Sequence, residues 1–229
     1  MNNKAVITII RWLVIIGMPF LLATFTVRAL IGWNSPGYPG FEYPRIAPDA
    51  YGFTEQERLD LANATLDYLQ RPEQANEVIY LLEDLRIPGT ERPLYNPQEI
   101  GHMLDVKIMA DAFKRVMWVL AVVVIGGLAF LLARSETRLL GYKTIMHGGL
   151  LTAAILLVVG LLIGVAWNFV FVQFHELLFP AGNWTFAYTD SLIRLFPERF
   201  WFDFGVLWVV GILVQGVILA GIGYLLQRR

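Results

Sequence analysis

Four long apolar runs alternate with polar segments along this chain of 229 residues. The runs cover residues 11–33, 116–133, 147–174 and 204–226. A helix needs roughly 20 apolar residues to cross the hydrocarbon core of a bilayer, and each run is close to that length or longer. The pattern therefore predicts an all-α, polytopic membrane protein, a single membrane domain over residues 1–229 with four transmembrane helices.

The first long polar segment, residues 34–115, carries signals for short helices. Thr54 and Glu57 have the spacing of a capping box, so we expect a helix to begin there and to end before Pro72. A second helix is expected over residues 73–85. These helices have apolar faces that need cover, so we expect a small helical extracytoplasmic cap between spans one and two rather than free linkers.

The end of this segment predicts an outer extension of the second span. Asn96 can cap a helix, Pro97 takes the first helical position and Glu99 the third. Nothing interrupts the pattern from there to Ala133, so one helix should run from outside the membrane into the span. A turn over residues 134–144 would then lead into span three.

The second polar segment, residues 176–203, is expected to form an interfacial loop. Asp190 is placed to cap a short helix over residues 191–196. Clusters of glycine, proline and asparagine predict turns at residues 34–40 and 180–184. Aromatic side chains are frequent in the loop, as is typical of the headgroup level of a bilayer.

Composition agrees with a membrane protein and removes several chemistries. Hydrophobic residues make up 56% of the chain and charged residues 16%, and a net charge of −1 gives no reason to expect a nucleic-acid partner. The absence of cysteine excludes disulfides, thiolate metal ligands and a cysteine nucleophile. The first run lacks a small-residue cleavage site, so we expect it to remain as an anchor.

Charge distribution predicts the orientation in the bacterial cytoplasmic membrane. The termini and the turn after span two carry one acid, Glu136, against these basic residues: Lys4, Arg11, Arg134, Arg138, Lys143, Arg228 and Arg229. Cytoplasmic loops carry an excess of lysine and arginine. Both termini are therefore expected in the cytoplasm, and both long polar segments outside.

Three histidines are the candidate catalytic groups, and two of them are expected on the outer side. His147 begins span three on the cytoplasmic side, where an interfacial role suffices. His102 lies on one helical stripe with Glu99 and Asp105, either of which could orient an imidazole. Alone, His102 or His175 could be a solvated or interfacial residue. Together they suit acid–base catalysis, or less readily metal binding with a carboxylate.

A distance along the chain stands against this pair. His102 precedes residue 116 by a length that corresponds to about 21 Å of straight helix, whereas His175 follows span three directly. The two can meet only if residues 106–113 are partly sunk in the membrane or the helix bends. A separation of more than about 10 Å between the imidazoles would exclude the dyad, because one substrate could not lie within hydrogen-bond reach of both rings.

Two stretches carry a family resemblance. One is Glu99-x-x-His102-Met103-x-Asp105-Val106-Lys107, and the other is Phe174-His175-x-x-x-Phe179, followed by Trp184, Asp190-Ser191-Leu192-Ile193, Phe196-Pro197-Glu198 and Phe200-Trp201. Together they resemble the bacterial lipoprotein intramolecular transacylase family of four-span membrane proteins. Leu178 departs from the pattern, since a second aromatic residue is expected there; this affects packing more than chemistry.

The resemblance implies an acyltransferase without metal or cofactor. Its partners would be diacylglyceryl-modified lipoproteins and membrane lipid, and the sn-2 acyl chain would move to the α-amine of the lipidated cysteine to give an N-acyl lyso-lipoprotein. His102 and His175 would be catalytic. Supporting roles, in orienting a histidine, stabilising the oxyanion or forming the site, are then expected for these residues: Glu99, Asp105, Lys107, Asn183, Trp184, Asp190 and Arg194. Arg194 could instead pair with Asp190 as a surface salt bridge.

Two other functions remain compatible with the sequence. The protein could be a non-enzymatic membrane scaffold or assembly protein, which would tolerate the loss of both histidines. It could also be a metal-dependent membrane hydrolase, which would be sensitive to chelators. The oligomeric state does not follow from the sequence.

Overall fold

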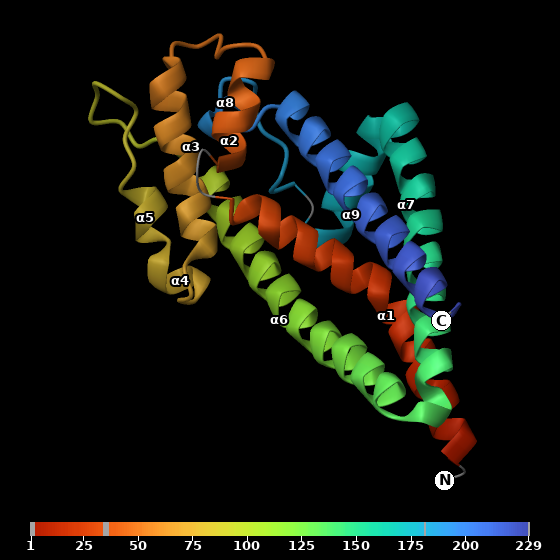
Figure 1. Cartoon of the computed structure of the whole chain (residues 1–229). Coiled ribbons are helices and arrows are strands. Elements are labelled where there is room, and N and C mark those ends of the chain that lie inside the picture. Colours follow the sequence, from red (N-terminus) through yellow and green to blue (C-terminus); the bar gives the residue numbers. More distant parts are fainter. Residues whose placement is uncertain (1–2, 34–36, 181, 229) are drawn as a thin grey trace. The chain divides into compact units, whose positions relative to one another are not determined.

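The computed structural model describes residues 3–33, 37–180 and 182–228 and is built of helices (Figure 1). Four of them are long and apolar enough to cross a membrane. They are α1 (Asn3–Ile31), α6 (Pro97–Ala133), α7 (Ser135–Leu178) and α9 (Glu198–Leu226). The prediction of an all-α protein with four spanning helices is confirmed. The predicted turns at 34–40 and 180–184 include residues 34–36 and 181, which lie outside the described part. For residues 37–40 the prediction of a turn was wrong, since they belong to the helix Gly37–Glu42.

Shorter helices occupy the polar segments. They are α2 (Gly37–Glu42), the 3₁₀ helix η1 (Tyr43–Arg45), α3 (Glu55–Gln70), α4 (Ala75–Val78), α5 (Tyr80–Glu83) and α8 (Ser191–Leu195). No helix was expected over the residues of α2 and η1. Their arrangement as a cap over the spans stays a prediction.

Two helix starts follow the predicted caps. The Thr54 hydroxyl accepts from Glu57 N, and the Glu57 carboxylate accepts from Thr54 N, which completes the capping box of α3. The Asn96 side chain accepts from the backbone N–H groups of Gln98 and Glu99 at 2.9 and 3.0 Å. Such caps satisfy N–H groups that have no partner within the helix. As predicted, α6 continues unbroken to Ala133.

Two other local predictions were wrong. The helix expected over residues 73–85 is split at Ile79 into α4 and α5, because the bonds Glu77 N to Gln74 O and Leu82 N to Ile79 O tighten the chain into three-residue turns. The turn expected over residues 134–144 is almost absent, since α7 begins at Ser135. The side chains of Thr137 and Arg138 donate to the carbonyls of Leu131 and Leu132 and so satisfy the end of α6 without a loop.

The chain forms two compact units. The first comprises Met1–Arg28, Phe113–Val165 and Val206–Arg229, and the second comprises Ala29–Ala112 and Ala166–Gly205. In α7 the helical dihedral angles are interrupted at Ala166 (φ −142°, ψ 41°), where the second unit begins.

Small residues bring helices of the first unit together. A Cβ atom placed on Gly149 of α7 would lie 2.5 Å from Ala220 N and Gly216 O of α9, so only glycine permits this approach. Between α1 and α6, Val14, Met18 and Val124 form a buried apolar cluster. Close backbone approach through small residues is the usual way in which membrane helices associate.

Long-range hydrogen bonds hold the second unit together and fix α8. The Tyr43 hydroxyl donates to Leu195 O at 2.7 Å, and Arg58 Nε donates to Arg194 O at 3.0 Å. The Tyr38 hydroxyl donates to Phe200 O at 2.9 Å. All of these side chains are buried, so each bond satisfies a polar group that water cannot reach.

Candidate functional site

His102 and His175 lie together in the second unit. His102 is in the second turn of α6, and His175 is close to the end of α7. Their ring centroids are 6.3 Å apart and the ring planes are inclined by 22°. This is well inside the limit of about 10 Å beyond which a shared proton-transfer site fails.

Aromatic rings enclose the histidine pair. His102 contacts the rings of Phe179 and Phe186 edge-on, at centroid distances of 5.0 and 5.3 Å. His175 lies 4.2 Å from the Phe171 ring and 5.0 Å from the Trp184 ring. His102 is only 7% exposed. Because a charged imidazolium loses hydration in such surroundings, they favour the neutral form of both rings.

Hydrogen bonding distinguishes the two rings. Nδ1 of His175 lies 2.8 Å from Phe171 O. A carbonyl oxygen can only accept, so Nδ1 carries the hydrogen, and a neutral His175 has an unprotonated Nε2. Nδ1 of His102 is buried and has no hydrogen-bond partner among residues 3–33, 37–180 and 182–228.

Asp105 and Asn183 connect α6 to the loop that carries Trp184. Asn183 Nδ2 donates to Asp105 Oδ2 at 2.5 Å. Two turns earlier, Gln98 Nε2 donates to the carbonyls of Gly182 and Thr185 at 3.2 and 2.9 Å. These three bonds hold the loop on both sides of Trp184, whose ring packs on His175. Asn183 Oδ1 is buried and unpaired in the described part of the chain.

Glu99 does not orient His102, contrary to one expectation. Its Oε1 accepts from Leu192 N and its Oε2 from Asn96 N, both at 2.7 Å. The carboxylate is 1% exposed and thus joins the start of α6 to α8. The Glu99 carboxylate bonds to these two backbone N–H groups rather than to the imidazole one turn away, and both bonds are charge-assisted.

Lys107 also has a role other than the expected one. Its Nζ donates to Arg71 O at 2.8 Å and lies 3.3 Å from Asp111 Oδ2, and the side chain is completely buried. The ammonium group therefore holds the end of α3 against α6. Two of its three N–H donors are thus used away from the histidines.

Arg194 and Asp190 do not pair with each other. Arg194 makes two hydrogen bonds to Asp49, at 3.1 and 2.8 Å, and its side chain is 9% exposed. Asp190 occupies the N-cap position of α8, but its carboxylate bonds backwards to Ala187 N at 2.8 Å instead of capping the helix. Both residues shape the loop and the α8 junction, and neither side chain is directed at the histidines by a contact.

Three neighbours of the site were missed at the level of sequence. Gln98 holds the loop, Asp49 binds Arg194, and Phe171 packs on His175 while its carbonyl accepts the hydrogen bond of His175 Nδ1. Phe171 could have been found, because it lies one helical turn before His175. Gln98 and Asp49 have partners more than 80 positions away, and no local pattern marks them. Within the described ranges, no three His, Cys, Asp or Glu side chains are grouped to hold a metal ion.

Comparison with known proteins gives consistent matches. The family model of the lipoprotein intramolecular transacylase Lit matches residues 9–201. An uncharacterised protein of Aquifex aeolicus (strain VF5) is 28% identical over 203 residues, which are 88% of this chain and 86% of that protein.

The fold is similar to that of the membrane-integral lipoprotein intramolecular transacylase Lit from Bacillus cereus. The TM-score is 0.68 at 21% identity, over 99% of this chain and 96% of that one. A structure of the same Bacillus cereus protein with one histidine changed to alanine has a TM-score of 0.62 at 20% identity, over 99% and 94% of the two chains.

Proposed function

Because this chain belongs to the lipoprotein intramolecular transacylase family, we propose that it transfers an acyl chain within a diacylglyceryl lipoprotein through His102 and His175. The sn-2 ester would give its acyl group to the α-amine of the lipidated N-terminal cysteine. The observation that carries the proposal is the histidine pair itself, two neutral imidazoles at 6.3 Å within a shell of aromatic rings.

The reaction needs one bond to form and one to break. The amine nitrogen bonds to the acyl carbon, and the bond from that carbon to the glycerol oxygen breaks. The nitrogen loses one proton and the glycerol oxygen gains one, so the exchange is balanced without water or a cofactor. Because donor and acceptor lie on one molecule, proximity can contribute roughly 7–11 kcal/mol towards the barrier.

His175 is suited to be the base. An α-amine has a pKa near 7.7–8.0, so at neutral pH a base must remove a proton before or during attack. The bond from Nδ1 to Phe171 O leaves Nε2 of the neutral ring ready to accept that proton. The same bond stabilises the imidazolium that results, because its donor becomes more acidic.

His102 then relays the proton: one of its ring nitrogens takes a proton from the His175 imidazolium while the other gives one to the departing glycerol oxygen, so both rings end neutral. Its ring lies against His175, so both can reach a single ester between them. The buried Oδ1 of Asn183 is a hydrogen-bond acceptor without a protein partner, and it suits an N–H of the attacking amine. Asp105 sets its orientation, since it accepts from the amide nitrogen of the same side chain.

The location we propose follows from charge. The basic residues at the termini and after α6 favour a cytoplasmic position for them, which turns the histidines outward. Diacylglyceryl lipoproteins carry their lipid in the outer leaflet of the cytoplasmic membrane. Phe179, Phe186 and Trp184 would then meet the acyl chains beside the imidazoles.

Mass spectrometry of lipoprotein N-termini tests the proposal. Cells that make the protein should contain N-acyl lyso-lipoproteins, and cells with His102→Ala or His175→Ala should retain the diacylglyceryl form. We expect each substitution to lower the rate by about 10²–10⁴-fold, the usual contribution of a general acid or base. His147→Ala is the matched control, because the His147 ring contacts its own helix at Lys143 O.

The outcome separates the enzyme from a scaffold protein. A scaffold protein would keep its effect after loss of either histidine, with no change in lipoprotein N-termini. If the wild-type protein gives no N-acyl lyso product from a diacylglyceryl lipoprotein, the transacylase proposal is wrong.

A further inference from the structure

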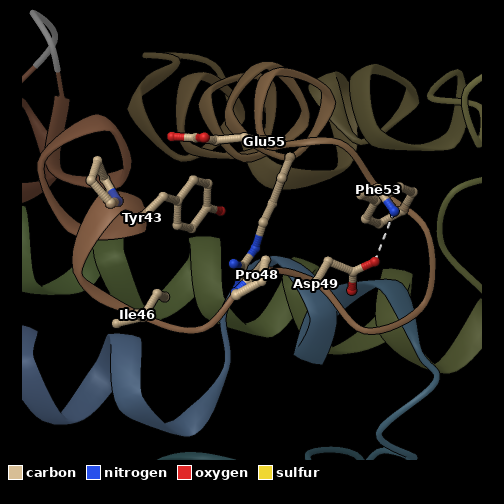
Figure 2. Close-up of a pocket in the computed structure, with 8 residues that line it drawn as sticks. Tyr43, Ile46, Pro48, Asp49, Phe53 and Glu55 are labelled. Atoms are coloured by element: carbon tan, nitrogen blue, oxygen red, sulfur yellow. Dashed lines mark hydrogen bonds between the residues drawn. The ribbon is translucent and has the colours of Figure 1, made fainter.

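A separate hollow lies in the second unit between η1, the loop that follows it and the start of α3 (Figure 2). Its lining residues are Tyr43, Pro44, Ile46, Pro48, Asp49, Phe53, Glu55 and Arg58. The volume is about 220 Å³. This is about seven times the roughly 30 Å³ that one water molecule occupies in the liquid, enough for a small polar group. None of the residues at the histidine pair lines it.

Arg58 provides a buried positive charge at this hollow. The residue is 4% exposed. Nε donates to Arg194 O and Nη1 to Ala47 O, both at 3.0 Å, and the guanidinium lies 4.3 Å above the Tyr43 ring. Backbone carbonyls are neutral, so these bonds orient the guanidinium without cancelling its charge. Burial lowers the pKa of Arg58, but a guanidinium stays charged at neutral pH.

The nearest carboxylate is fully occupied elsewhere. Asp49 accepts two hydrogen bonds from Arg194, at 3.1 and 2.8 Å. It accepts two more from the backbone N–H groups of Phe53 and Tyr51, at 2.8 and 3.1 Å. A carboxylate has about four acceptor positions, so none remains for Arg58. Within the described part of the chain, no carboxylate lies within ion-pair distance of Arg58.

Such a charge is costly in isolation. A buried ion without a counter-ion loses hydration and gains nothing in return, so buried arginines are usually paired. The free Nη2 of Arg58 and the second hydrogen of Nη1 make a fork that matches two oxygens of a phosphate or carboxylate. Asp49 is close enough to raise the pKa of Arg58, but it is already paired with Arg194, so two buried cations share one carboxylate. An anion in the hollow would balance the second cation.

Glu55 adds an opposite charge to the same hollow. It is the first residue of α3, its side chain is exposed, and it forms no hydrogen bond in the described part. Figure 2 shows the Glu55 carboxylate above Tyr43, with Asp49 and Phe53 on the other side of the hollow. The hollow therefore presents a buried cation and an anion at its rim, which suits a group with both charges.

We propose that this hollow binds a phosphoethanolamine group, with the phosphate on Arg58 and the ammonium on Glu55. Two carbon atoms separate the charges in that group, so its phosphate and its ammonium can face different residues of the hollow. The group occurs in water-soluble phosphate esters and as the head of a common membrane phospholipid, and the binding chemistry is the same for both. The site is independent of the acyl transfer proposed above.

Calorimetric titration of the purified full-length protein tests the site. The probes are phosphoethanolamine, inorganic phosphate and ethanolamine, in a detergent that carries neither phosphate nor ammonium. We expect phosphoethanolamine to bind at least tenfold more tightly than either part alone. Arg58→Gln should weaken phosphoethanolamine and phosphate binding at least tenfold, since it removes a charge-assisted contact.

Glu55→Gln gives a sharper signature because its effect should change sign with the probe. It should weaken phosphoethanolamine binding several-fold, through loss of the ammonium contact. It should strengthen inorganic phosphate binding, through loss of repulsion. Glu55 is exposed, so this variant stays folded even if Arg58→Gln does not. Glu73→Gln, an exposed glutamate outside the hollow, is the matched control and should change neither value.

Measurements in lipid nanodiscs show whether the phosphoethanolamine group comes from a membrane lipid or from a soluble ester. Nanodiscs of phosphatidylethanolamine should raise the midpoint of thermal unfolding above that in phosphatidylglycerol if a lipid head occupies the site, and Glu55→Gln should remove the difference. Binding of the soluble ester without that difference identifies a free phosphate ester instead. No binding of either form, or Glu55→Gln shifting both probes in the same direction, overturns the proposal.

Discussion

Replacing Glu99 with glutamine removes one acceptor from the buried junction between α6 and α8. The carboxylate accepts from Leu192 N and Asn96 N, both at 2.7 Å, and is 1% exposed. Glutamine has the same shape but a single oxygen. One backbone N–H would therefore face an NH₂ group, and no water can reach it.

The cost follows from these two bonds. A hydrogen bond to a charged group contributes about 1.5–3 kcal/mol to stability, and a buried donor left unpaired loses that contribution. For a chain of this size, 1 kcal/mol shifts the unfolding midpoint by about 2–4 °C. Multiplying the lost free energy by this shift per kcal/mol, we expect Glu99→Gln to lower the unfolding midpoint by roughly 3–12 °C.

Glu57→Gln is the matched control for this measurement. Glu57 has the same place in the capping box of α3, but it is only partly buried and bonds only to Thr54, the cap of its own helix. Glutamine can take the same place in a capping box, so we expect little change in stability. Thermal unfolding of both purified variants, followed by tryptophan fluorescence in one detergent, compares the two glutamates directly.

Acyl transfer by the same samples, measured well below both midpoints, separates two roles for Glu99. A junction residue lowers stability and leaves the pH profile of the reaction unchanged. The opposite result is an unfolding midpoint within about 1 °C of wild type together with a shifted pH profile. A change of about 1 °C is less than the loss of a charge-assisted hydrogen bond implies, so this result would mean that Glu99 orients His102 and would refute the junction role.

Two further predictions concern buried packing and charge. Burial and the neighbouring Asp203 raise the pKa of Glu42 from 4.5 to about 7. Its proton therefore stabilises the fold below pH 4.5, and that contribution, about 3 kcal/mol at 1.36 kcal/mol per unit, is lost as pH rises through 7. Glu42→Gln should flatten the unfolding midpoint over this interval, and an unchanged slope would contradict the assignment. Gly149→Ala should lower the free energy of unfolding by about 1–3 kcal/mol, because the added methyl group overpacks against α9. Gly221→Ala is the control and should be neutral or stabilising, because no atom lies near its Cβ position. Equal unfolding midpoints for the two variants would count against the close approach of α7 and α9.

Local signals were sufficient for most of the architecture. The four apolar runs predicted the spanning helices because hydrophobic burial depends on the residue types alone. Thr54 with Glu57, and Asn96 with Glu99, predicted two helix starts because cap and partner lie three positions apart. The same reasoning failed over residues 73–85, where apolar residues continue but the backbone tightens at Ile79.

The candidate site divides in the same way. The sequence alone identified His102 and His175 as the chemical groups, since a chain without cysteine and with three histidines offers few others. It did not determine which carboxylate or cation serves them. Glu99 was expected beside an imidazole and instead holds Leu192, 93 positions away, while Arg194 was expected at the chemistry and instead binds Asp49.

The physical reason is competition among polar groups. Every carboxylate in the chain could accept from many donors, and helical spacing ranks only those within one turn. Which donor wins depends on burial, because an unpaired buried group costs more than an exposed one. Burial is decided only when distant segments pack, as when α6, α8 and the loop from Gly182 to Thr185 meet. The sequence determined what groups the site could use, and the tertiary structure decided which of them face the histidine pair.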